Sequence, residues 1–179
     1  MTFTESPLAG AFVVELERRR DERGFFARAY CATEFAEHGL GPELRQCSVS
    51  YNARQGTLRG LHYQAAPHEE HKLVRCTSGA VFDVIVDLRP ASPTYRRWFG
   101  ADLTADNHRS LFIPPGFAHG FISLTDHAEV YYMISAPYAA ESSRGVRWND
   151  PAFGIAWPLA PAVISARDAA YPLLDTGAV

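Results

Sequence analysis

The stretch SGAVFDVIVDLRPASP, residues 78–93, decides the fold that the sequence predicts. Gly79 opens the run, and Pro90 and Pro93 close it. Between these turn residues the side chains alternate, with Phe82, Val84, Val86 and Leu88 on one face and Val81, Asp83, Ile85 and Asp87 on the other. A period of two between turn residues is typical of a β-strand.

The rest of the chain repeats this pattern of short strands between turns. SLFIPPGFAHGFISL (110–124) gives two apolar runs, and AEVYYMIS (128–135) places Val130, Tyr132 and Ile134 on one face. The residues 11–17 form a candidate first strand. Helix is expected only at 33–38, where Thr33 would cap the helix and Gly39 would end it. We therefore predict an all-β, double-sheet barrel or sandwich with short peripheral helices.

The chain is expected to form one domain over residues 1–179, with the tail after Trp148 wrapped on its body. Apolar residues make up 47%, charged residues 21%, and the formal net charge is −3. This charge gives no reason to expect nucleic acid or a membrane as a partner. The N-terminus lacks a signal-peptide pattern, so we expect a cytoplasmic protein. Cys31, Cys47 and Cys76 form neither a zinc nor a disulfide pattern.

Candidate chemistry gathers in TLRGLHYQAAPHEEHKLVRC, residues 57–76. Arg59 suits a phosphate but could equally be a surface residue, and His62 could be a catalytic base or a structural residue. The two residues lie three apart, so they share one face of a strand only if Gly60 allows a bulge. His68, Glu69, Glu70 and His71 belong to a loop that is expected to shape the edge of a pocket.

A metal site is the alternative interpretation of these histidines. Cupin barrels often bind a metal through two histidines and a glutamate from one strand pair, with a third histidine on a later strand. Gln64 occupies the place of the second ligand, although His119 resembles the later one. With only two donors in strand positions, we expect no metal.

Seven longer motifs resemble the nucleotide-sugar 3,5-epimerase family typified by dTDP-4-dehydrorhamnose 3,5-epimerase. They are DERGFF (21–26), LRGLHYQ (58–64), KLVRC (72–76), VFDVIVDLR (81–89), IPPGFAHGF (113–121), WNDPAFGIAWPL (148–159) and ISARDAAYPLLD (164–175). The resemblance implies a cupin-type jelly roll and a homodimer that uses no metal and no cofactor. It also implies that a nucleoside-diphosphate 4-keto-6-deoxyhexose is the substrate and that the N-terminal part of one subunit reaches its partner's nucleotide site.

The same resemblance implies roles for individual residues. His62 would be the base, Asp168 its partner, Tyr132 the acid that protonates the opposite face, and Lys72 the cation that stabilises an enolate. Substrate contacts are implied for a wider set: Arg23, Phe26, Arg28, Gln46, Ser48, Arg59, His119, Tyr138, Arg144 and Arg167.

Several positions depart from the family pattern on the nucleotide side. Arg28 replaces a glutamate, Ser48 replaces an asparagine, and Ser143 or Arg144 stands where a glutamate is expected. Met133 stands where the family often has a lysine. The sequence favours dTDP but leaves open the base and whether C3, C5 or both carbons react. The alternatives are a 3,4-ketoisomerase, a sugar-nucleotide-binding protein without turnover and a metal-dependent cupin oxygenase.

Overall fold

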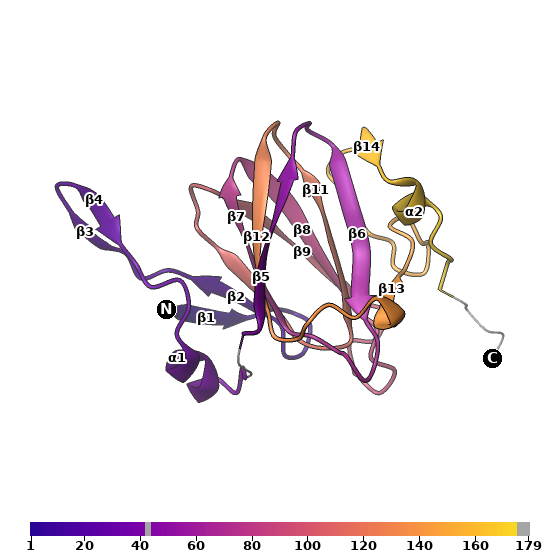
Figure 1. Cartoon of the computed structure of the whole chain (residues 1–179), viewed down its shortest axis with the longest axis horizontal. Helices are drawn as coiled ribbons and strands as arrows, with labels where there is room; N and C mark the ends of the chain where they lie inside the picture. Colours follow the sequence, from indigo (N-terminus) through magenta and orange to yellow (C-terminus); the bar gives the residue numbers. More distant parts are fainter. Residues whose placement is uncertain (42–43, 175–179) are drawn as a thin grey trace.

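Two antiparallel sheets face each other, as the alternating pattern predicts (Figure 1). The computed structural model describes residues 1–41 and 44–174. The first sheet, in spatial order, comprises β1 (Thr2–Glu5), β2 (Phe12–Glu15), β10 (Ser110–Ile113), β7 (Lys72–Ser78), β12 (Ala128–Ile134) and β5 (Gln46–Asn52). The second comprises β13 (Ser143–Gly145), β6 (Thr57–Gln64), β11 (Phe117–Ser123), β8 (Ala80–Asp87) and β9 (Trp98–Thr104), with β14 (Val163–Ile164) parallel to β6. This is the predicted double-sheet jelly roll.

The strand β8 is buried on both faces, which explains its nearly continuous apolar sequence. Val81 and Ile85 point into the core between the sheets. Val84 and Val86 point outward, where Phe153 of the C-terminal tail packs on them. The predicted wrapping of the tail around the body is therefore confirmed, and a short helix, α2 (Ala166–Ala169), lies in this tail beside β6 (Figure 1).

Two details of the sequence prediction are wrong. The first strand of the chain is β1, which was not predicted. The strand predicted at 11–17 is the second strand, and it is shorter than predicted because it spans only Phe12–Glu15. The helix α1 spans Ala32–Glu37, with Cys31 at its N-cap and no side-chain capping bond from Thr33. Tertiary packing places this helix, because buried Phe35 joins a cluster with Val14 and Phe112. Gly39, at φ +70°, ends it as predicted.

The charged residues of the stretch 18–23 form an exposed hairpin with the residues that follow them. The hairpin consists of β3 (Arg19–Asp21) and β4 (Gly24–Phe26), and Figure 1 shows that it projects away from both sheets. Phe26 is 75% exposed at its base. Within the described residues, no helix is long and apolar enough to cross a membrane.

Candidate active site

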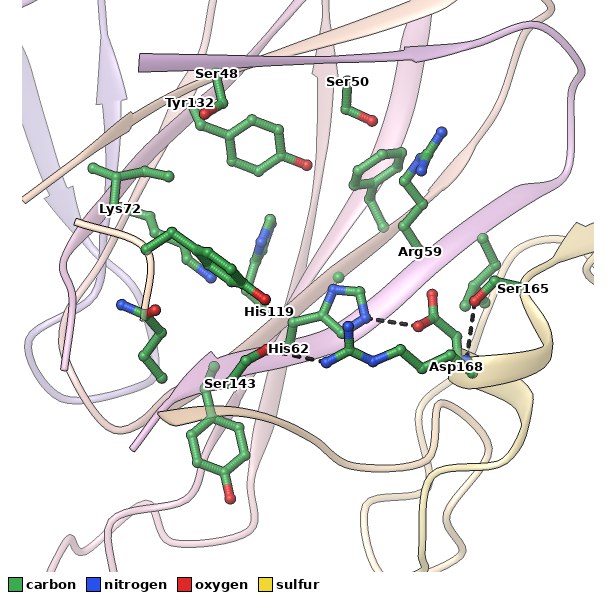
Figure 2. A pocket seen from close by; sticks show the side chains of 18 of the residues that line it. Ser48, Ser50, Arg59, His62, Lys72, His119, Tyr132, Ser143, Ser165 and Asp168 are labelled. Atoms are coloured by element: carbon green, nitrogen blue, oxygen red, sulfur yellow. Dashed lines mark hydrogen bonds and ion pairs between the residues drawn. The ribbon is translucent and has the colours of Figure 1, made fainter. Parts of the chain in front are cut away.

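A cavity of about 740 Å³ lies between the two sheets and is lined from both of them. Ser143 of β13, which follows the 3₁₀ turn η1 (Ala140–Ser142), and Arg167 and Asp168 of α2 also line it. Figure 2 shows the polar side chains that point into it. The polar residues that line the cavity include Gln46, Ser48, Ser50, Arg59, His62, Glu70, Lys72, His119, Tyr132, Tyr138, Ser143, Arg167 and Asp168.

His62 and Asp168 form a hydrogen-bonded pair at one wall of the cavity. The Nε2 atom of His62, on β6, lies 2.8 Å from Oδ1 of Asp168, on α2. Oδ2 of Asp168 accepts the Gly60 N–H at 3.2 Å, and Ser165 caps α2 by accepting the Asp168 N–H at 3.0 Å. Burial favours the neutral acid, but these hydrogen bonds outweigh it, so the pKa of Asp168 lies below its ordinary value. The carboxylate is therefore charged at neutral pH, and His62 keeps Nδ1 for a ligand.

An irregularity in β6 brings Arg59 and His62 to the same cavity. The register between β6 and β11 shifts between His119 and Phe121, opposite Gly60, as the predicted bulge requires. Gly60 has φ +127°, and a Cβ atom built on it would lie 2.6 Å from the Cα atom of Gly120. The backbones of β6 and β11 can approach this closely only because both facing positions, Gly60 and Gly120, are glycine. The bulge is thus confirmed, and the residue types at both positions explain it.

Tyr132 enters the cavity from the facing sheet, and Figure 2 shows its phenol and the His62 ring directed into the same space from opposite sides. Burial, and after it the negative charge of Asp83, raises the pKa of Tyr132. The phenol is therefore fully protonated at neutral pH. It holds a proton that could be donated, although burial makes it a weaker acid than an exposed tyrosine.

Lys72 begins β7, which pairs with β12, the strand that carries Tyr132. The Lys72 side chain is 11% exposed. Its Nζ atom lies 2.9 Å from Oε1 of Glu70, whose side chain is 10% exposed. Both residues line the cavity because residues two apart on an extended chain point to the same side. Sequence analysis assigned Glu70 only to the rim of a pocket, although the two-residue spacing could have indicated the contact with Lys72.

His119 lies on the floor of the cavity and is bound to a buried carboxylate. Its Nε2 atom lies 3.0 and 2.9 Å from the two oxygens of Asp83, on the neighbouring strand β8. Over residues 1–41 and 44–174, no three His, Cys, Asp or Glu side chains gather in a way that could hold a metal ion. The partnership with Asp83 was missed, because only the strand pairing reveals it.

Gln64 fixes the rim of the cavity through its buried amide group. Its Nε2 atom donates to the carbonyl oxygens of His68 and Pro137, at 2.9 and 3.2 Å. Its Oε1 atom accepts the Ala139 N–H at 2.7 Å. One side chain of β6 therefore holds the loop before Lys72 and the segment that carries Tyr138. Sequence analysis considered Gln64 only as an absent metal ligand.

The remaining predicted substrate contacts divide into two groups. Gln46, Ser48, Tyr138 and Arg167 line the cavity as expected. Arg144 does not, because its guanidinium donates to the carbonyl oxygens of Glu141 and Ser143; the alternative position, Ser143, does line the cavity.

Three predicted contacts of the N-terminal part lie outside the cavity of their own chain. Arg23 pairs with Asp21 in the projecting hairpin, and Arg28 pairs with Glu34 at 3.2 Å. Phe26, which lies between these two arginines in the sequence, is exposed. The last residue of the final motif, position 175, lies outside the described residues.

The comparisons with known proteins identify a family and agree with this fold. The family model described as dTDP-4-dehydrorhamnose 3,5-epimerase matches residues 5–176. A curated dTDP-4-dehydrorhamnose 3,5-epimerase from Sinorhizobium fredii is 41% identical over 175 residues, which cover 97% of this chain and 90% of that protein.

Solved structures of such enzymes superpose closely on this chain. The enzyme of Bacillus anthracis, with TDP and PPi bound, has a TM-score of 0.93 at 42% identity, covering 97% of this chain and 99% of that one. The enzyme of Legionella pneumophila, in complex with dTDP-4-keto-L-rhamnose, has a TM-score of 0.91 at 37% identity, covering 99% and 94%. A 3'-monoepimerase from Streptomyces bikiniensis, in complex with dTDP-quinovose, has a TM-score of 0.86 at 32% identity, covering 94% and 85%.

Proposed function

This chain belongs to the dTDP-4-dehydrorhamnose 3,5-epimerase family and is an epimerase of a dTDP-linked sugar; from this premise we propose its mechanism and its reacting carbons. The substrate is a dTDP-linked 4-keto-6-deoxyhexose, and C3, C5 or both are inverted by proton transfer without a cofactor. The observation that carries the proposal is the pairing of His62 with Asp168 across the cavity from a protonated Tyr132.

The proposed reaction begins when His62 removes a proton from a carbon next to the ketone. The electron pair of that C–H bond delocalises onto the C4 oxygen to give an enolate, and His62 becomes an imidazolium that Asp168 stabilises. The Lys72 ammonium stabilises the oxygen charge as it develops.

Tyr132 then donates its phenolic proton to the opposite face of the same carbon, so the configuration inverts as the enolate returns to the ketone. The phenol is protonated at neutral pH, as a donor must be, and the positive charge of Arg59 opposes the rise in pKa that burial causes. Solvent exchange then returns a proton to Tyr132 and removes one from His62, which restores the starting state. The side chain of His62 is 40% exposed, which supports such an exchange.

We further propose that the protein acts as a homodimer. The exposed hairpin carries Arg23 and Phe26, two residues implied to bind a nucleotide, yet it projects away from the cavity of its own chain (Figure 1). A partner subunit that receives this hairpin would bring both residues to a second cavity. Sedimentation should then give a dimer, and a mixture of hairpin and His62 variants should recover activity that each lacks alone.

Deuterium wash-in tests the proposed reaction. The protein is incubated in D₂O with a dTDP-4-keto-6-deoxyhexose, and NMR follows the hydrogens at C3 and C5. We expect exchange at one or both carbons, with the ketone remaining at C4. The His62→Ala variant should lose all exchange, whereas His38→Ala, at an exposed histidine after α1, should retain it. Movement of the ketone to C3, or undiminished exchange by His62→Ala, would overturn the proposal.

A further inference from the structure

The cations of the cavity differ in whether a carboxylate balances them. The guanidinium of Arg59 donates to the Asn52 side chain at 2.8 Å and to the Tyr51 carbonyl oxygen at 3.2 Å. Arg167 donates to the Ser143 hydroxyl at 3.0 Å. Within the described part of the chain, the hydrogen-bond partners of both arginines are neutral, so neither is paired with a carboxylate. Their two positive charges exceed the one negative charge of the neighbouring Asp168, which binds His62 instead.

Both arginines flank the His62–Asp168 pair. Arg59 precedes Gly60, whose N–H is bound by Asp168, and Arg167 precedes Asp168 in α2. Lys72 lies across the cavity, on the other sheet, and Figure 2 shows it on the opposite side from Arg59. We call these the arginine side and the lysine side of the cavity.

The lysine side is electrically balanced. Glu70 holds the Lys72 ammonium at 2.9 Å, and the two side chains are 10% and 11% exposed, so solvent screens the pair little. Among the described residues, Lys72 is the ion-pair partner of Glu70. An ammonium on a four-carbon stem is a mobile point charge. A fixed carboxylate restrains its position and makes the pair neutral toward a distant diphosphate, while the ammonium still donates to an oxygen that contacts it.

We propose that Glu70 is a positioning residue that orients the substrate in the cavity by neutralising Lys72. With the lysine side neutral, the diphosphate binds at the unbalanced arginines, and the uncharged sugar ring lies between His62 and Tyr132. Without Glu70, Lys72 would attract the diphosphate to the side where the sugar must react. This inference rests on the proposed function, since it requires a substrate with one charged and one neutral end.

Inorganic pyrophosphate is a probe that reports the charge of the cavity without any turnover. Calorimetric titration compares the wild-type protein with Glu70→Gln, which keeps the shape and one acceptor oxygen but removes the negative charge. We expect Glu70→Gln to bind pyrophosphate about tenfold more tightly, the order expected when one unit charge near a polyanion is removed at intermediate dielectric. The matched control is Glu69→Gln, an exposed neighbour outside the cavity lining, whose affinity should stay at the wild-type value.

Two further variants complete a double-mutant cycle for Glu70 and Lys72. Lys72→Met should weaken pyrophosphate binding, and the double variant Glu70→Gln with Lys72→Met should return it to the wild-type value, because the lysine side is neutral again. A neutral pair is well tolerated where an ion pair was buried, so the double variant keeps the cycle testable even if Glu70→Gln alone folds poorly. In that case, tighter binding by the double variant than by Lys72→Met reports the Glu70 charge.

Equal affinity of the wild type and Glu70→Gln, or equal tightening by Glu69→Gln, would overturn the role of Glu70. Deuterium exchange by the wild type is measured separately. Its absence would refute the proposed function, whereas exchange together with unchanged pyrophosphate affinity would refute only the role of Glu70.

Discussion

Asp168→Asn tests the proposed base directly, because the side chain keeps its size but loses its charge and one acceptor. Asp168 now serves two groups, the Gly60 N–H at 3.2 Å and His62 Nε2 at 2.8 Å. An asparagine has one oxygen for both. If that oxygen stays on Gly60, the amide N–H donates to His62 Nε2 and the ring proton moves to Nδ1. The nitrogen that should accept the substrate proton is then occupied.

The cost of this change can be estimated from the same contacts. If the amide turns to restore the tautomer, the buried Gly60 N–H loses its acceptor at about 1–3 kcal/mol. In either orientation the imidazolium formed during the reaction loses a charged hydrogen-bond partner, which is worth about 1.5–3 kcal/mol. The sum, about 2.5–6 kcal/mol, corresponds to exchange that is roughly 10²- to 10⁴-fold slower.

The assay is the initial rate of deuterium incorporation from D₂O into a dTDP-4-keto-6-deoxyhexose, with thermal unfolding as the test of folding. The control is Ser165→Ala, which removes the cap of α2 but leaves the carboxylate, so its rate should stay within about tenfold of the wild type. A folded Asp168→Asn protein with a rate also within tenfold would refute the reasoning, since neither amide orientation permits it.

Three other predictions concern the acid, a buried carboxylate and the glycine contact. Tyr132→Phe should retain deuterium exchange but lose inversion, because only the phenolic proton is removed; NMR of the product would contradict this by showing full inversion. Burial would raise the pKa of Asp87, but hydrogen bonds from Arg89, Ser92 and Thr94 outweigh it and lower this pKa from 3.8 to about 2. Asp87→Asn should therefore lower the free energy of unfolding at pH 7 by about 2.5 kcal/mol. The pKa of Asp87 is lower in the folded state than in the unfolded state, so this stabilisation is complete above about pH 4 and is lost as the pH falls through 2. Urea unfolding should therefore show that the difference in free energy of unfolding between the wild type and Asp87→Asn vanishes in acid. Gly120→Ala would place a Cβ atom 2.6 Å from the Arg59 carbonyl oxygen. We therefore expect the free energy of unfolding to fall by about 1–3 kcal/mol and deuterium exchange to slow. The control is Gly41→Ala, whose Cβ atom would meet nothing within 4 Å and which should unfold like the wild type.

The strands that sequence analysis located are those with a periodic or continuous apolar pattern over most of their length. The strand β8 was located by its alternation, and β10 and β11 were located as two continuous apolar runs, which fits their complete burial. The strand β1, Thr2–Glu5, lies at a sheet edge and is mostly exposed, so burial imposes no pattern on it. The start of α1 was misplaced because packing of Phe35 fixes this helix, and no capping side chain marks it.

The site was predictable only where its parts are local in sequence. The three-residue spacing of Arg59 and His62 brings both to one face only if β6 bulges, and the intervening Gly60 marked where such a bulge could lie. The contact of His62 with Asp168 joins residues 106 positions apart, and no periodicity brings these together. Resemblance to a family supplied that pair, and the structure gives its distance and hydrogen bonds.

The amide of Gln64 has a consequence for how enzymes of this design could diversify. Its three partners are main-chain atoms of His68, Pro137 and Ala139, so the bond pattern is indifferent to which side chains those segments carry. Sequence can therefore drift along both borders of the reaction chamber while their spacing from His62 stays constant. Grafting these two borders between relatives should alter which sugar is accepted and leave the proton-transfer apparatus untouched.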